Sequence, residues 1–144
     1  MKDTLPNGTQ LLTRFYHEFW NERRFEILDE LVAQDCQLHF AEHSHSICSE
    51  KSRKVQREWV RSFPDLKFTV HNIVEEGDLS AVRLTFEGTH EEEFEGLAPT
   101  NKHIRVTEML FAKVRDGKIC EMWEDYDKLG MMQQLGYALS KPQS

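Results

Sequence analysis

The spacing of the hydrophobic residues changes once along the chain, and this change limits the folds that the chain can adopt. Between residues 11 and 32 hydrophobic residues recur every three or four positions, which predicts amphipathic helices. From residue 66 onward they alternate with polar residues, as Val82, Leu84 and Phe86 do, which predicts half-buried strands. Helices followed by long strands that are joined by tight turns predict an α+β domain with an antiparallel sheet.

Local signals at the ends of these segments define the expected elements. Asn7 or Thr9 can cap the first helix, and Asn21 can end it. Residues 41–49 are polar and contain two histidines, and residues 91–100 contain four glutamates, so both segments are predicted to be loops. We expect helices near residues 9–21, 25–32, 49–63 and 129–135, and strands near residues 36–40, 66–73, 81–90, 104–114 and 119–126.

Length and charge narrow the classes of function. The 144 residues are enough for one domain at 1–144, with a core at about 9–136 and a frayed tail at 137–144. The 18 basic and 25 acidic residues give a net charge of −7, which argues against a nucleic-acid partner. No apolar run approaches the roughly 20 residues of a membrane span, and the N-terminus lacks an apolar signal core. We therefore expect no membrane partner and a cytoplasmic location.

The sequence lacks the motifs of several common enzyme classes. Its three cysteines form no CxxC pair, so they predict neither a zinc knuckle nor a redox pair. The sequence has no Gly-rich phosphate loop, no GxSxG and no HExxH. His39, His43 and His45 could in principle bind zinc, but their spacing spans a strand end and a loop. We therefore expect no metal site.

Several segments, taken in order, are typical of one protein family. They are FPDLKF at 63–68, GTH at 88–90, Phe94-x-Gly96 with Pro99-Thr100, DGKIxExWxxxD at 116–127, and LGMMQQLG at 129–136. On these segments the chain resembles the SnoaL-like polyketide cyclases of the nuclear-transport-factor-two-like superfamily. The resemblance implies a cone-shaped α+β barrel, with a curved antiparallel sheet wrapped over N-terminal helices and a central pocket. It further implies a homodimer, no cofactor, and a carboxylate that acts as acid and base in an intramolecular aldol ring closure.

The resemblance also assigns individual residues to the pocket. Glu124 falls where the family has its catalytic aspartate, so a carboxylate is kept with one extra methylene. Met122 and Leu110 fall where the family has histidines, and they would line the pocket without hydrogen bonding. His39 lies in the first predicted strand, where relatives often carry a histidine that faces the pocket, and it would orient the substrate. His90 matches a family position near the pocket rim.

The register of the last hairpin decides whether Glu124 faces a second carboxyl. A two-residue turn at Asp116-Gly117 would place Met109 opposite Glu124, whereas a type I turn followed by a bulge at Gly117 would place Glu108 there. We favour the second register, because it agrees with the family pattern. The Cβ atoms of the two glutamates would then lie about 5 Å apart, and one of the two carboxyls should hold its proton near neutral pH. If the register is wrong, Glu108 or Glu124 points to solvent instead.

Other candidates have both a structural and a functional interpretation. Trp59 and Phe15 lie on apolar helix faces, where they can pack in the core or line the pocket. Asp125 and Asp127 are the rival carboxylates in the last strand, and we expect Asp127 to cap the final helix.

The sequence therefore supports three classes of function on one fold. The first is an enzyme that acts on a small, apolar, carbonyl-bearing molecule, with Glu124, Glu108 and His39 as catalytic residues and no cofactor. Its substrate-binding residues would be Leu110, Met122, Trp59, His90 and Phe15. The alternatives are a non-catalytic binding protein and a dimeric assembly module.

Overall fold

The structure of the protein is a computed structural model that describes residues 4–143. Its elements follow the predicted order of helices first and long strands afterwards. The helical elements are α1 (Gly8–Arg14), the π-helix η1 (Phe15–Asn21), the 3-10 helix η2 (Phe25–Ile27), α2 (Leu28–Leu31), α3 (Glu50–Ser62) and α4 (Lys128–Gln134). The strands are β1 (Val32–Phe40), β2 (His43–Ser46), β3 (Lys67–Glu76), β4 (Leu79–Thr89), β5 (His103–Arg115) and β6 (Lys118–Tyr126).

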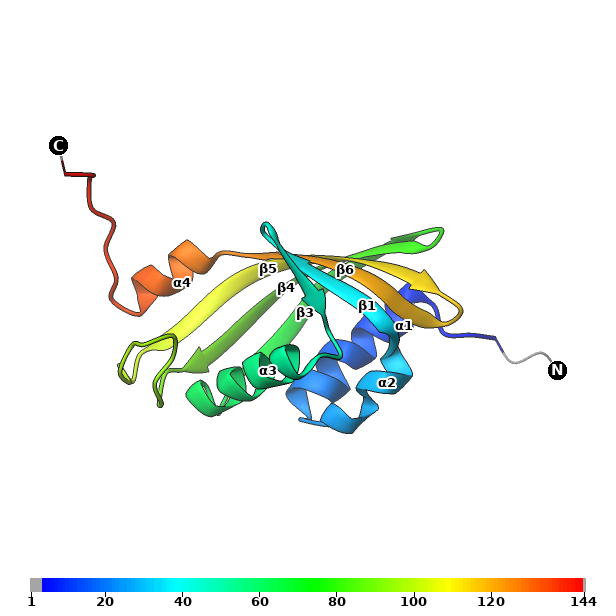
Figure 1. Ribbon diagram of the computed structural model, residues 1–144, viewed down its shortest axis with the longest axis horizontal. Helices are drawn as coiled ribbons and strands as arrows, with labels where there is room; N and C mark the ends of the chain where they lie inside the picture. Colours follow the sequence, from blue (N-terminus) through cyan, green and yellow to red (C-terminus); the bar gives the residue numbers. More distant parts are fainter. Residues whose placement is uncertain (1–3, 144) are drawn as a thin grey trace.

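The six strands form one curved, unclosed sheet in the order β2-β1-β6-β5-β4-β3. The helices α1, α2 and α3 lie on one side of this sheet, below it in Figure 1. The predicted α+β class with a curved sheet over helices is therefore confirmed. Two details differ from the prediction: β1 pairs with β6 in parallel, and residues 43–46 of the expected loop form the edge strand β2. None of the helices within residues 4–143 has the length and apolar character needed to cross a membrane.

Side chains at the predicted positions cap the helices. Asn7 accepts a hydrogen bond from the backbone N–H of Gln10 at 2.9 Å, and the Gln10 side chain accepts one from the N–H of Asn7. Ser49 caps α3. Asp127 caps α4 by accepting from the N–H of Gly130 at 2.9 Å, as expected from the sequence. These contacts satisfy backbone donors that have no partner inside the helix.

A π-helical segment carries the first aromatic side chains into the interior. It continues α1 over Phe15–Asn21 and ends where the sequence predicts, at Asn21. The Asn21 side chain donates to the carbonyl of Phe68 at 2.8 Å and accepts from the N–H of Phe68 at 2.7 Å. The wider turn of a π-helix is often found at functional sites. Here Asn21 ties the segment to β3, and Phe15 and Tyr16 face the sheet.

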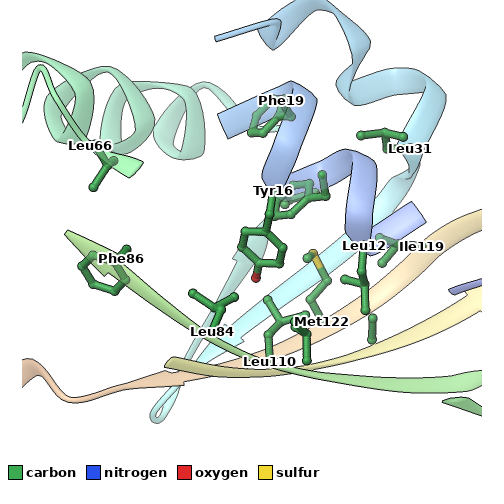
Figure 2. Packing of buried hydrophobic residues seen from close by; sticks show 14 of the residues in the cluster. Leu12, Tyr16, Phe19, Leu31, Leu66, Leu84, Phe86, Leu110, Ile119 and Met122 are labelled. Carbon is green, nitrogen blue, oxygen red and sulfur yellow. The ribbon is translucent and has the colours of Figure 1, made fainter. Parts of the chain in front are cut away.

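The core lies between these helices and the inner face of the sheet. Figure 2 shows Leu12 and Tyr16 above the strands that carry Leu84, Leu110 and Met122. All five side chains are buried. Because side chains alternate between the two faces of a strand, the neighbours of these strand residues point away from the core.

The hairpin between β5 and β6 turns at Asp116 and Gly117. Their φ angles are 53° and 75°, so both lie in the left-handed region of a two-residue type I′ turn. Arg115 consequently pairs with Lys118. The predicted type I turn with a bulge at Gly117 is wrong, because aspartate adopts the left-handed conformation more readily than most residues.

A bulge at Cys120 then sets the face on which Glu124 lies. The pairing shifts by one residue there, so Glu124 lies opposite Leu110, and Glu108 lies opposite Tyr126. A shift of one residue moves every later side chain to the other face of the sheet, and this one places Glu124 on the same face as Glu108. The prediction that Glu108 and Glu124 are directly opposite is therefore wrong. They are diagonal neighbours on one face.

Candidate active site

A pocket lies between the inner face of the sheet and the helical layer. Its volume is about 370 Å³, which lies within the usual range for sites that bind small molecules. Many of its walls are aromatic. The aromatic side chains come from the π-helix, from α3 and from four strands; they include Phe15, Trp20, Trp59, Phe40, Phe68, Phe86 and Tyr126.

Two carboxyl groups share a hydrogen bond inside this pocket. Glu108 comes from β5 and is buried, with 4% of its surface exposed, whereas Glu124 comes from β6 and is half-buried. Their side chains hydrogen bond each other. Two carboxylates cannot form such a bond, since one of the pair has to donate a proton. The pocket therefore holds one proton between two glutamates.

Tyr16 from the π-helix completes a chain of three polar groups. Its hydroxyl donates to Oε2 of Glu108 at 3.2 Å. Burial, followed by the charges of Glu108 and Glu124, raises the pKa of Tyr16 well above its ordinary value, so the phenol remains a neutral donor. The phenol donates to one oxygen of Glu108, which acts as the acceptor. The proton of the Glu108 carboxyl is then on the other oxygen, which faces Glu124.

The surroundings of the two glutamates raise their pKa values to different extents. Burial, and then the charge of Glu124, raises the pKa of Glu108 well above its ordinary value. Burial also raises the pKa of Glu124, to about 7, while the hydrogen bond from Glu108 opposes the rise. Glu108 thus holds the proton at neutral pH, and Glu124 gains or loses one there. A group with this acidity is suited to general acid–base catalysis.

The aromatic walls favour a flat apolar ligand. The ring of Trp59 lies 4.8 Å from that of Phe94 and 5.5 Å from that of Phe86, and Phe40 stacks on Tyr126 at 4.9 Å. These contacts fix the rings and leave their remaining faces available to a ligand. The arrangement excludes water from one side of the two carboxyls and so strengthens electrostatic interactions there.

Most of the site residues expected from the sequence lie together here. The pocket is lined by Glu108, Glu124, Met122, Trp59 and Phe15. Leu110 is not among these lining residues. It is buried in the core beneath the pocket, beside Met122 in Figure 2.

His39 lies outside the pocket, contrary to expectation. Its Nδ1 is 2.6 Å from Oγ of Ser44, and its Nε2 is 2.7 Å from Oε2 of Glu121. Its ring stacks on Trp123 with centroids 5.5 Å apart. The neighbouring residues Leu38 and Phe40 line the pocket, so strand alternation directs His39 to the opposite face of the sheet. The predicted strand was correct, but the predicted direction of this side chain was wrong.

His90 also lies away from the pocket lining. Its ring is fully buried and stacks on Phe63 at 5.5 Å. Its Nδ1 accepts the backbone N–H of Thr100 at 3.2 Å, and the Thr100 hydroxyl is 3.0 Å away. His90 therefore fastens the acidic connection between β4 and β5. The prediction that His90 contacts the substrate is therefore not supported by this geometry, in which the ring packs in the interior and holds a loop.

Sequence analysis missed Tyr16 as a member of the site. The residue lies among phenylalanines and tryptophans on the apolar face of the first helix, and only its position relative to Glu108 reveals its role. The available signal was a single hydroxyl on an otherwise apolar aromatic face. His43 and His45 of the expected loop were missed as well, and so was Lys51 at the start of the next expected helix, because the fold brings all three to the pocket rim.

The comparisons with known proteins agree on one family. The family model "SnoaL-like polyketide cyclase" matches residues 10–135. IdmH of Streptomyces antibioticus, provisionally described as a polyketide cyclase, is 34% identical; the match covers 90% of this chain and 98% of IdmH, with a TM-score of 0.77. AclR of Streptomyces galilaeus, provisionally described as a hydroxylase, is 25% identical over 89% of this chain and 94% of its own, with a TM-score of 0.80.

More distant structures share the fold. A protein of Jannaschia sp. CCS1, provisionally described as a SnoaL-like polyketide cyclase, is 21% identical over 96% of this chain and all of its own, with a TM-score of 0.80. No curated protein matches the sequence. The family model spans most of the chain, and IdmH exceeds 30% identity over nearly its full length. The chain therefore belongs to the SnoaL-like polyketide cyclase family.

Proposed function

We propose that the protein is an enzyme that moves protons on a small, largely apolar carbonyl compound, with Glu124 as the catalytic acid and base. The observation that carries this proposal is the hydrogen-bonded pair of Glu108 and Glu124 in an aromatic pocket. Family membership favours ring closure by an intramolecular aldol reaction as the overall reaction. The protein's own groups suffice for these proton transfers.

The reaction follows from the protonation states of the pair. The Glu124 carboxylate removes a proton from a carbon next to a carbonyl, and the C–H electron pair passes into an enolate. The enolate carbon attacks a second carbonyl carbon of the same molecule, forming a C–C bond and an alkoxide. The alkoxide then takes the proton back from Glu124. Product and substrate are isomers, so no other reactant is consumed.

The remaining pocket residues support this step. Glu108 keeps its proton and donates to Glu124, and Tyr16 positions Glu108. These two groups supply hydrogen bonding that the resemblance expects from histidines at Leu110 and Met122. We assign substrate contact to Met122, Trp59 and Phe15, whereas Leu110 supports the floor of the pocket.

Exchange of α-hydrogens in D2O tests the proton-transfer step without knowledge of the natural substrate. We expect the protein to speed the loss of the C2 hydrogen signal of 1-tetralone, a flat aromatic ketone, in proton NMR spectra. The ketone fits an aromatic pocket and carries hydrogens next to its carbonyl. An exchange rate equal to that in buffer alone, with the ketone bound, would contradict the proposal.

The alternative function is a non-catalytic binding protein on the same scaffold. The apolar residues at Leu110 and Met122 favour it, because they replace hydrogen-bonding groups of the family pattern. This alternative predicts that 1-tetralone binds and that its α-hydrogens exchange no faster than in buffer. The same experiment therefore separates the two functions.

We also propose that two copies pair through the outer face of the sheet, as the family resemblance implies. This face carries exposed apolar side chains, including Val74 (66% exposed), Met109 (64%) and Phe111 (46%). Contiguous exposed apolar residues of this kind often mark interfaces between proteins. A charge placed among them should oppose pairing.

Replacing Met109 by glutamate should convert the dimer into a monomer, because the carboxylate would lose its water at the interface. Sedimentation velocity at micromolar concentration measures this change. Leu129→Glu is the matched control, since Leu129 is exposed on α4 and away from this face. A wild-type protein that sediments as a monomer would contradict the proposed dimer.

A further inference from the structure

Polar side chains gather at the rim of the pocket, between the edge strand β2 and the start of α3. His43 and His45 point inward from β2, and Lys51 and Ser52 come from the first turn of α3. Within residues 4–143, none of these four side chains forms a hydrogen bond or an ion pair with another group of the protein. They are hydrogen-bond donors at the entrance of the pocket, and they have no acceptor among the described residues of the protein.

The charge on this side of the rim is positive. Lys51 lies close enough to His45 that its charge, after burial, lowers the pKa of the imidazole, so His45 is a neutral donor at neutral pH. Across the entrance, Glu95 also lines the pocket, but Lys128 pairs with it at 3.2 Å. Among the described residues no carboxylate forms an ion pair with Lys51, so it faces the entrance as a free cation in a chain of net charge −7.

The far end of the pocket has the opposite character. Glu108 and Glu124 lie there, and Glu124 carries a negative charge in the carboxylate form that acts as a base. A ligand with an anionic group would be repelled from that end and attracted to the rim. The pocket thus has a polarity that fixes which way such a ligand enters.

We propose that the ligand is an aromatic or polyunsaturated carbonyl compound that carries a carboxylate at its outward end, bound by Lys51 with His45 and Ser52 as further donors. This inference rests on the proposed function, since it assigns the reacting carbonyl to the end near Glu124. The rim then orients the substrate by charge, while the aromatic walls bind its body.

A pair of probes that differ only in charge tests the inference. Anthracene-2-carboxylate and anthracene-2-carboxamide have nearly the same shape, and their fluorescence reports binding at about pH 8 and low salt. We expect the wild-type protein to bind the carboxylate about five-fold more tightly, a modest factor because Lys51 is exposed. The preference should shrink as salt is added, because ions screen an exposed charge.

Substitutions locate the source of the preference. Lys51→Met should abolish the preference for the carboxylate and leave the affinity for the carboxamide unchanged, and Lys51→Arg should keep it. Lys54→Met is the matched control, because Lys54 is an exposed lysine of α3 that does not line the pocket. It should bind both probes as the wild type does.

Each outcome bears on a different claim. Equal affinity for both probes, or a preference that survives in Lys51→Met, would overturn the rim inference and leave the proton-transfer proposal standing. Failure of both probes to bind would contradict the aromatic pocket itself, and with it both proposals.

Discussion

Replacing Glu124 by glutamine is expected to slow the exchange of α-hydrogens in 1-tetralone by about 10²- to 10⁴-fold, the usual contribution of a positioned general base. Glutamine has nearly the same shape and can accept the hydrogen bond from Glu108 through its amide oxygen. It cannot take a proton from carbon. The affinity for the ketone and the circular dichroism spectrum should therefore stay as in the wild type.

Glu121→Gln provides a matched control for this experiment. Glu121 is a glutamate of the same strand, but it lies on the opposite face and pairs with His39. Its substitution should leave the exchange rate unchanged. An unchanged rate in Glu124→Gln would remove Glu124 from the mechanism, whereas a loss of rate in Glu121→Gln would point to a site on the outer face.

The sequence predicts most of the elements because their signals are local. Alternation along 81–90 and 104–114 predicted strands that the structure places at Leu79–Thr89 and His103–Arg115, within two residues at every end. Asp127 was identified as a helix boundary because its side chain bonds a nearby backbone N–H, that of Gly130. Asn21 was identified as another boundary, although its side chain bonds the distant backbone of Phe68. The edge strand β2 was missed, because its four polar residues gain strand structure only by pairing with β1.

The site was harder to predict because it depends on which face each strand residue occupies. The bulge at Cys120 has no marker in the sequence, yet it decides that Glu124 lies on the same face as Glu108. The sequence analysis expected Glu108 and Glu124 to lie together on the basis of a register that the turn at Asp116 does not adopt, whereas the bulge at Cys120 brings them together. His39 alternates with the pocket-lining residues Leu38 and Phe40, so the strand directs its ring outward.

The paired carboxyls also lower the stability of the folded protein, and the sign of this effect can be worked out. An ordinary glutamate has a pKa of 4.5, and burial raises that of Glu124 to about 7 in the folded chain. Between these pH values the unfolded chain has released the proton and the folded chain still holds it. The free energy of unfolding therefore falls as pH rises through this range, by about 1.4 kcal/mol per pH unit for each retained proton.

Glu124→Gln should consequently be more stable than the wild type at high pH. The amide has no proton to lose in this pH range. The variant therefore lacks the fall in the free energy of unfolding that Glu124 causes as pH rises. Near pH 4 we expect similar free energies of unfolding for the two proteins, because the Glu124 carboxyl is then largely protonated in both the folded and the unfolded chain. By about pH 7 the free energy of unfolding of the variant should exceed that of the wild type by about 2 to 3 kcal/mol.

Urea denaturation at a series of pH values measures this difference, with Glu121→Gln as the parallel control. The control should follow the wild-type curve, because Glu121 is paired on the outer face. A Glu124→Gln variant no more stable than the wild type at about pH 8 would show that the carboxyl is not held against its ordinary acidity. In that case Glu124→Gln would lose catalysis without gaining stability. The folded wild-type protein would then not be destabilised by holding this base in the pocket.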